Sequence, residues 1–474
     1  MSKVNNLIKD TIIFAIGGIG SKFILFLMVP LYTHFLTTEQ YGTSELTNTI
    51  VQLLVPFLSM MIFEAVTRFG FSSNVNKKDV FKNAFTVICI GSLISIIITP
   101  LLAFYESIAT WKWYVCINVI LSMHLSLLLN YLKINNKNLI YASSSLLQTL
   151  VLAICNILFL KFKNLGIKGY LSSTVISYCV SVVFCFIFSD AKDAIRNGKI
   201  DKKMLKEMMV YSVPLIFNNI SWWIIHSSDK IMTEMMISSA ALGIYTVSSK
   251  IPSLVNVVTS IFQQSWGISS IKEIESTNSK KFIEDVFLYL QTFVFLMCIC
   301  IIMIIKPFMK IYVDNNFYSA WIYVPILLLA STFNTISSYF GTLYGALKKS
   351  LNNMITTIIG GLVNIICNYI FIKLIGIWGA SLGTLISYIV VTIIRMIDCS
   401  KISGLKVNYR LFIVNSIIVS NLVALVSFNI NIYIVSIITL IIFSLINYKI
   451  IKSIIKYIFG LMYKRIERKN CNDS

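Results

Sequence analysis

Long apolar runs recur from one end of the chain to the other, and they constrain the fold more than any other feature. A run of 18 or more residues with few charges is long enough to cross the hydrocarbon core of a bilayer as a helix. These runs far exceed the ~10-residue alternating strands of an outer-membrane barrel, so helices are the expected spanning form. The sequence predicts about fourteen spans: 11–36, 43–67, 83–105, 113–132, 142–162, 168–189, 209–233, 241–267, 283–305, 318–346, 350–373, 376–398, 411–429 and 431–455.

Composition agrees with an all-α polytopic membrane protein. Hydrophobic residues make up 57% of the chain, and the mean hydropathy is +0.80. Charged residues make up only 13%, against about 25% in soluble globular domains. Most of the ten cysteines lie inside apolar runs, where they act as small apolar side chains. This balance disfavours a soluble enzyme.

The formal net charge of +20 follows a topological pattern. If the N-terminus is cytoplasmic, 30 of the 40 Lys and Arg residues fall in or beside inside segments, Arg395 among them, and 7 fall in outside loops. Basic residues concentrate in cytoplasmic loops of membrane proteins. The pattern therefore predicts a bacterial inner or plasma membrane protein with both termini in the cytoplasm, and it disfavours nucleic acid as a partner.

The longest polar segment, 190–208, divides the predicted spans. We expect an N-lobe of six spans at 1–189, a basic cytoplasmic linker at 190–208 and a C-lobe of six spans at 209–398. A final pair of spans and a basic tail would follow at 399–474. From Asp201 onward the linker favours a basic amphipathic helix on the membrane surface; recruitment of partner proteins is the alternative.

The two groups of six spans resemble each other. Residues 166–178 and 376–388 are identical at seven of thirteen positions, at an offset of 210. The other two matches pair 155–161 with 367–373 and, more weakly, 36–42 with 237–243. An even number of spans per repeat leaves both halves facing the same way. The sequence thus predicts two parallel six-helix lobes around a central cavity, an arrangement suited to alternating access.

Ionisable residues inside spans are costly and usually face a bundle interior or a wet cavity. Here they cluster in spans 1, 2, 7 and 8, which are repeat-related pairs. The candidate substrate-binding residues are Lys22, Arg68, Asp229, Lys230 and Lys250, and the candidate coupling residues are Glu45, Glu64 and His226. Simpler roles stay open for some of them. Asp229 and Lys230 are equally suited to anchoring at the interface, and Glu64 and Arg68 have the spacing of a helix-surface ion pair. Pro56 and Pro252 are predicted to kink their spans.

Two stretches carry a family resemblance. The first runs from Val29-Pro30-Leu31 through Leu36-Thr37 to Tyr41-Gly42, and the second joins Asp229-Lys230 to Gly243-Ile244-Tyr245. In these, and in span count, the chain resembles the Wzx-type polysaccharide flippases of the multidrug/oligosaccharidyl-lipid/polysaccharide exporter superfamily. The resemblance implies a cavity lined by helices 1, 2, 7 and 8. It also implies a lipid-pyrophosphate-linked oligosaccharide as substrate, such as an O-antigen or capsule repeat unit.

Three other functions stay open. A cation-coupled multidrug antiporter of the same superfamily would use the carboxylates Glu45, Glu64 and Asp229, and a lipid II flippase would share the chemistry of a polysaccharide flippase. A membrane glycosyltransferase or polymerase should show a large extramembrane loop with clustered acidic or His residues, and the sequence has none. We therefore expect a transporter without a cofactor rather than an enzyme. It would be driven by a proton or sodium gradient, by the potential or by substrate pull, with a polymerase and glycosyltransferases as possible partners.

Overall fold

The computed structural model describes residues 20–72, 75–273, 279–428, 430–453 and 456, and the regular structure in these ranges is helical. Ten described helices are long and apolar enough to cross a membrane, and the bent pair α3 (Thr38–Leu58) and α4 (Ile62–Gly70) passes the same test as one span. Each of the fourteen predicted ranges overlaps helical structure. The chain is thus a multi-pass α-helical membrane protein, and the count of fourteen spans stays a prediction.

The second predicted span is broken close to its proline. α3 contains Pro56 and ends at Leu58, and α4 leaves it at an angle of 56°. Met60 and Met61, between the two helices, have positive φ angles of 50° and 51°. A proline inside a helix removes one hydrogen bond and crowds the preceding turn, so the predicted kink is confirmed here. Pro252 lies within α12 (Ser239–Glu273), which is a single helix.

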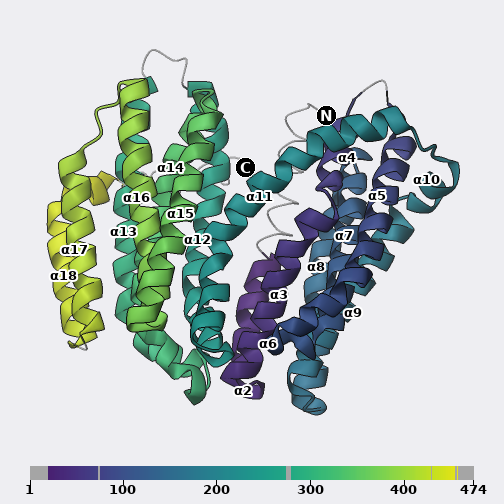
Figure 1. Ribbon diagram of the computed structural model, residues 1–474. Coiled ribbons are helices and arrows are strands. Elements are labelled where there is room, and N and C mark those ends of the chain that lie inside the picture. The colour runs from purple at the N-terminus through teal and green to yellow at the C-terminus, as the bar shows by residue number, and fades with distance from the viewer. Residues whose placement is uncertain (1–19, 73–74, 274–278, 429, 454–455, 457–474) are drawn as a thin grey trace, which may run out of the picture. The chain divides into compact units, whose positions relative to one another are not determined.

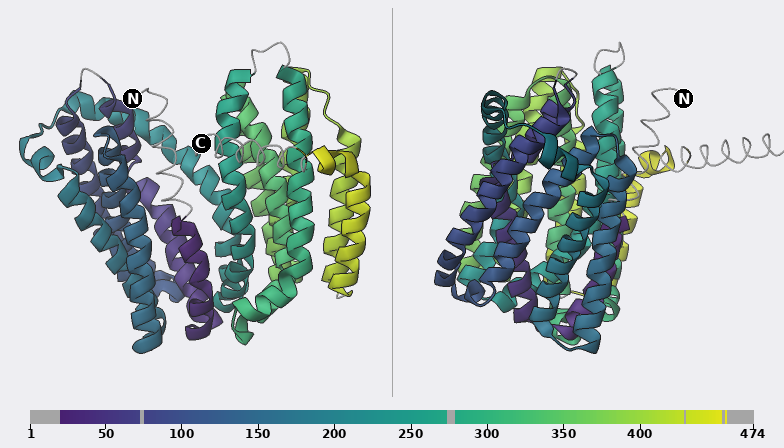
Figure 2. Two further views of the ribbon diagram at one scale, coloured as in Figure 1. Left: turned by 180° about the vertical axis from the view of Figure 1, so that it is seen from behind. Right: turned by 90° about the vertical axis from the view of Figure 1, so that its right-hand side faces the viewer.

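The chain folds into two compact units, and unit 1 comprises Met1–Val247, Tyr312–Ser319 and Ile372–Ala380. Its further helices are α2 (Val29–Phe35), α5 (Lys77–Ile98), α6 (Glu106–Ala109), α7 (Lys112–Ile134), α8 (Asn138–Asn156), α9 (Gly166–Phe188), α10 (Ala191–Asn197) and α11 (Lys202–Met236), with short 3-10 and π segments at Thr99–Phe104 and Ile157–Phe162. α5, α7, α8 and α9 run side by side (Figures 1 and 2). Apolar side chains such as Phe81, Val119 and Met123 form their core.

Unit 2 contains most of α12 and the helices that follow it. These are α13 (Ser279–Tyr312), α14 (Val324–Ala346), α15 (Ser350–Ile375), α16 (Ile377–Ser403), α17 (Tyr409–Ser427) and α18 (Ile432–Ile446). The end of α15, the first turn of α16 and most of a 3-10 segment at Asn315–Ile322 belong to unit 1. α17 packs through Phe412 against Phe287, Phe295 and Phe333. α17 and α18 also pack on each other (Figure 1). The compact units divide at Val247, after α11, and the lobe boundaries at 189 and 209 stay a prediction.

Arg395 lies in the interior of unit 2, with 4% of its surface exposed. Its Nε donates to Thr356 Oγ1 (3.0 Å), Nη1 to the Ser337 carbonyl (3.1 Å) and Nη2 to Thr357 Oγ1 (2.8 Å). No described carboxylate pairs with it. The sequence pattern counts Arg395 with the inside segments. Neutral acceptors on α14 and α15 surround the guanidinium, and the side of the membrane on which Arg395 lies stays a prediction.

The segment predicted as a linker is tied to the start of α5. Lys78 forms an ion pair with Asp193 of α10 (2.6 Å), and the Lys199 N–H donates to Asp79 Oδ1 (2.7 Å). The hydrogen bond from Lys78 lowers the pKa of the Asp193 carboxyl, with a second hydrogen bond from Asn197 in support. Asp201 caps α11 by accepting from the N–H groups of residues 203 and 204. The segment after Asp201 is helical and continuous with α11, and its position on the membrane surface stays a prediction.

Residues paired by the sequence repeat share local structure. Gly166 and Gly376 both have positive φ, +54° and +61°, and each lies at the start of a helix. Asn156 and Asn368 are both fully buried, and each amide donates one hydrogen bond while its oxygen has no partner among the described residues. Equivalent roles at these positions support the internal repeat, since chance similarity between apolar helices does not predict them.

The third repeat match forms a contact within unit 1. A Cβ on Gly42 of α3 would lie 1.7 Å from the Ser239 carbonyl oxygen, and one on Gly243 of α12 would lie 2.0 Å from the Thr38 oxygen. Thr38 and Ser239 are themselves a repeat pair, so the contact is reciprocal. Backbone approach of this kind needs residues without side chains. The first turn of α12, which continues into unit 2, is thereby packed directly on α3.

We predict that Gly42→Ala destabilises the protein strongly, because the added methyl group meets backbone rather than a movable side chain. Overpacking of this kind typically costs about 1–3 kcal/mol. The midpoint of thermal unfolding of the purified protein measures the effect. Gly345→Ala in α14 is the control, because no atom outside the local backbone of α14 lies within 4 Å of its Cβ position. Equal midpoints for the two variants would contradict the close crossing.

Candidate functional site

An ion pair joins α3 to α11 inside unit 1. Lys230 Nζ lies 2.6 Å from Glu45 Oε1, and the two side chains are 21% and 11% exposed. A charge removed from water is costly unless an opposite charge or hydrogen bonds compensate for it. The structure thus brings together one predicted substrate-binding residue and one predicted coupling residue, and each neutralises the other.

Asp229 is the next charged residue of this region, and only 6% of it is exposed. Its carboxylate accepts a hydrogen bond from the Tyr245 hydroxyl of α12 and another from the Lys230 N–H (2.9 Å). Tyr245 is itself buried. Asp229 thus links α11 to the first turns of α12. Its burial favours an interior role over the interface anchor that the sequence left open.

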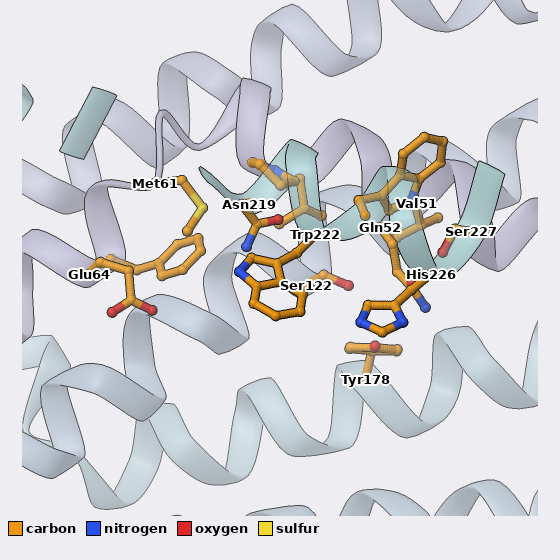
Figure 3. A pocket seen from close by; sticks show the side chains of 14 residues that line it. Val51, Gln52, Met61, Glu64, Ser122, Tyr178, Asn219, Trp222, His226 and Ser227 are labelled. Carbon is orange, nitrogen blue, oxygen red and sulfur yellow. The ribbon is translucent and has the colours of Figure 1, made fainter. Parts of the chain in front are cut away.

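Next to the ion pair, unit 1 contains a pocket of about 430 Å³. Side chains from α3, α4, α7, α9 and α11 and from the break between α3 and α4 surround it (Figure 3). The lining residues are Val51, Gln52, Val55, Pro56, Met61, Phe63, Glu64, Ser122, Tyr178, Asn219, Trp222, Trp223, His226 and Ser227. In the view of Figure 3, Glu64 and Met61 lie at one end, His226 and Tyr178 lie at the other, and Trp222 and Asn219 lie between them.

The aromatic side chains of α11 are held in defined orientations. Trp222 stacks on His226 one turn later, with ring centroids 5.7 Å apart and an interplanar angle of 8°. The neighbouring Trp223 donates from its indole Nε1 to the Thr49 carbonyl of α3 (3.2 Å). Residues four apart lie on one face of a helix, so one turn of α11 contributes both a tryptophan and a histidine to the pocket.

Sequence reasoning found two of the lining residues, Glu64 and His226, and it missed the uncharged ones. A charge inside a span marks a residue as a candidate, and these lining residues are uncharged: Gln52, Ser122, Tyr178, Asn219 and Trp222. One signal was available: Trp222 and Trp223 are adjacent in a chain that has only seven tryptophans.

The remaining predicted residues do not line this pocket. Lys22 is exposed on the helical stretch 20–27, and Arg68 is exposed in the last turn of α4. Among the described salt bridges none joins Arg68 to Glu64, so the structure does not form that expected pair. Lys250 lies on α12 within unit 2 and is partly exposed. That Lys22 and Lys250 face one cavity stays a prediction.

Glu234 of α11 is a second buried carboxyl that the sequence analysis did not single out. It is 6% exposed and accepts hydrogen bonds at Oε1 from the Ser107 and Ser239 hydroxyl groups. Its Oε2 has no partner among the described residues. α11 therefore carries Asp229, Lys230 and Glu234 within two turns.

Comparison with known proteins identifies the family. The model of the polysaccharide biosynthesis protein family matches residues 7–266, more than half of the chain. The chain belongs to the polysaccharide biosynthesis protein family. Two relatives from Haemophilus influenzae are described as "Lsg locus putative protein 1" (22% identical over 258 residues) and "Uncharacterized membrane protein" (23% over 263). These alignments cover 52% and 53% of this chain, and in each case 62% of the relative's length.

This polysaccharide biosynthesis family member shares its fold with solved transporters. The lipid II flippase MurJ in an inward closed conformation superposes with a TM-score of 0.69 at 16% identity, over 93% of this chain and 100% of MurJ. The Vibrio cholerae MATE transporter VcmN gives 0.57 at 13% identity, over 84% and 96%. An inward-facing MATE transporter of the MOP superfamily gives 0.59 at 13% identity, over 77% and 94%.

Family and fold together confirm the resemblance drawn from the sequence. The solved structures that share this fold are a lipid II flippase and MATE transporters of the MOP superfamily, which is the superfamily to which the sequence resemblance pointed. The structural neighbours are a flippase and transporters, which favours a transporter over a membrane glycosyltransferase or polymerase.

We predict that Lys230→Met lowers the midpoint of thermal unfolding, because Glu45 inside unit 1 loses the cation that lies 2.6 Å from its carboxylate. Breaking a fully buried pair typically costs about 3–5 kcal/mol, and we expect less here because the two side chains are 21% and 11% exposed. The charge-swapped double variant Glu45→Lys/Lys230→Glu should recover part of the loss, which a double-mutant cycle would measure. Lys78→Met is the control: it breaks a pair of the same 2.6 Å length whose side chains are about 45% exposed. A control as unstable as Lys230→Met would argue against a special role for the buried pair.

Proposed function

We propose that this protein moves a polyprenyl-pyrophosphate-linked oligosaccharide repeat unit from the cytoplasmic to the outer leaflet by alternating access. Membership of the polysaccharide biosynthesis protein family carries the proposal. The MurJ-like fold supports it, since MurJ is a flippase for a lipid-linked substrate. The location that goes with this function is the bacterial inner or plasma membrane with both termini in the cytoplasm.

The main physical obstacle is the polar headgroup, which must cross ~30 Å of hydrocarbon. A diphosphate can cross only where cations and hydrogen-bond donors replace its water. We propose that Lys22, Lys250 and Arg68 supply this positive charge, because Lys22 and Arg68 are exposed and Lys250 is partly exposed. Lys230 contributes less net charge, since Glu45 offsets it. The lipid tail would stay in the bilayer throughout.

The membrane potential favours the proposed direction. Outward movement of one negative charge across an inside-negative potential of 100 mV releases about 2.3 kcal/mol, so two charges release about 5 kcal/mol. Glu45, Glu64, Asp229 and His226 are the residues that a proton or sodium gradient would use in addition.

A cation-coupled drug antiporter is the alternative that the MATE likeness keeps open. It needs carboxylates available to a cation. Of the three predicted for this role, Glu45 is paired with Lys230 and Asp229 is hydrogen-bonded to Tyr245, so Glu64 is the most accessible. This arrangement favours the flippase over the antiporter.

We predict that deletion of the gene abolishes the surface polysaccharide and that the lipid-linked repeat unit accumulates on the cytoplasmic side. Extraction of lipid-linked saccharides, with protection of the cytoplasmic pool from external glycosidases, measures both. The alternatives give different results. Loss of a lipid II flippase would stop growth with accumulated lipid II, and loss of an antiporter would change drug sensitivity while polysaccharide remains.

A second prediction concerns the basic residues. Lys22→Ala and Lys250→Ala should each reduce surface polysaccharide at least about tenfold at normal protein levels, because each removes one cation from the headgroup path. Lys→Arg at either site should retain more export than Lys→Ala, since charge is kept although geometry changes. Lys373→Ala, at an exposed position late in α15, is the control. Wild-type export by both alanine variants would argue against a charge-neutralising path.

A further inference from the structure

We propose that the pocket between α3, α4, α7, α9 and α11 holds one sugar ring of the substrate, and that this sugar is neutral or carries an amine. The inference rests on the proposed function and divides the substrate into two subsites. The sugar would occupy the pocket, and the diphosphate would bind elsewhere, on the basic residues.

The charges of the pocket separate it from a phosphate site. Its lining contains one carboxylate, Glu64, and one histidine, His226, but neither lysine nor arginine. Proteins bind phosphates with Arg and Lys or with rows of backbone N–H groups at helix starts. A diphosphate placed here would lie near a carboxylate without a compensating cation, so the pocket is unsuited to that part of the substrate.

Aromatic rings give the pocket flat apolar faces. Trp222 is 39% exposed, is stacked on His226 and lies beside Asn219 in Figure 3. A sugar ring carries C–H groups on one face and hydroxyl groups at its edge, so it packs on an indole while its rim stays free to hydrogen-bond. The stacking on His226 and the Trp223 hydrogen bond to Thr49 hold the aromatic surface before a ligand arrives, which lowers the entropic cost of binding.

Unpaired polar groups surround this aromatic face. The side chains of Gln52, Asn219 and Glu64 form no hydrogen bond to any described residue. The Ser122 hydroxyl is buried and also lacks a partner. One turn earlier on α7, Asn118 is 1% exposed, and both polar atoms of its amide are unpaired. Asn118 does not itself line the pocket, and Gln52 and Glu64 are exposed. The buried Ser122 hydroxyl is the lining group that departs from the rule that buried polar groups have partners. Together with the side chains of Gln52, Asn219 and Glu64 it offers donors and acceptors that sugar hydroxyls can meet.

The size and charge of the pocket narrow the ligand further. A volume of about 430 Å³ is within the range of small-molecule sites. It holds a sugar ring and is too small for a whole repeat unit with its diphosphate. Glu64 at one end repels a uronic acid, accepts from a hydroxyl group and attracts an amine. The pocket therefore selects by the charge of the sugar.

The test uses the full-length purified protein in detergent micelles and measures binding of N-acetylglucosamine, glucosamine and glucuronic acid by saturation-transfer NMR. Undecaprenyl pyrophosphate without sugar is a separate ligand. We expect the neutral and amino sugars to bind at least about tenfold more tightly than glucuronic acid. Trp222→Ala should weaken their binding about tenfold, and Glu64→Gln should reduce the discrimination against glucuronic acid. Binding of undecaprenyl pyrophosphate should not change in either variant.

Trp113→Ala is the matched control, because Trp113 is 50% exposed on α7 and does not line the pocket. The inference is overturned if the wild type binds none of the neutral or amino sugars, or binds glucuronic acid equally well. It is also overturned if Trp222→Ala binds sugar as the wild type does, or if the pocket variants lose the lipid pyrophosphate equally. Polysaccharide export separates the two proposals. If deletion of the gene abolishes export and the Trp222→Ala variant restores it fully, the sugar subsite is rejected. The flippase function is then still supported.

Discussion

A charged side chain inside a membrane helix bundle needs an ion pair or hydrogen bonds from neighbouring helices. This requirement determines which helices of the protein contact one another through polar groups. Lys230 of α11 pairs with Glu45 of α3, and Asp229 accepts from Tyr245 of α12. In unit 2, Arg395 donates to neutral acceptors on two neighbouring helices. Each interaction joins separate helices, so the same contacts that make the charges tolerable also hold the bundle in register.

The pairing has a consequence for transport. Because Glu45 offsets Lys230, this pair offers little net positive charge to a substrate, and the pocket beside it is aromatic and polar. α11 contributes Trp222 and His226 to that pocket and Lys230 to the ion pair. Movement of α11 relative to α3 would therefore change both at once. A ligand shifts a conformational equilibrium only if its contacts differ between the two states. Contacts of the substrate with α11 would differ in this way if α11 moves.

The candidate site shows where prediction from sequence succeeded and where it failed. A search for charges inside spans found Glu45, Lys230 and Asp229, because such residues are too costly to occur without a role. The same search could not find Gln52 or Trp222, which are unremarkable singly in an apolar run. Only the packing of five helices brings them around one pocket. The position of Arg395 near the end of a predicted span also does not reveal that it is buried, because an arginine there can extend to the interface or turn into the bundle.

The sequence by itself determined the class of structure, its helices and much of its repeat, because hydropathy over some 20 residues and glycine at a left-handed turn are local properties. Gly166 and Gly376 adopt that turn, and Pro56 precedes a break, as local chemistry requires. The tertiary structure decided which side chains meet. Glu45 and Lys230 are 185 residues apart, and Gly42 meets Gly243 across two helices. Such pairings depend on how helices cross, and crossing is set by the sum of many weak contacts that no single segment contains.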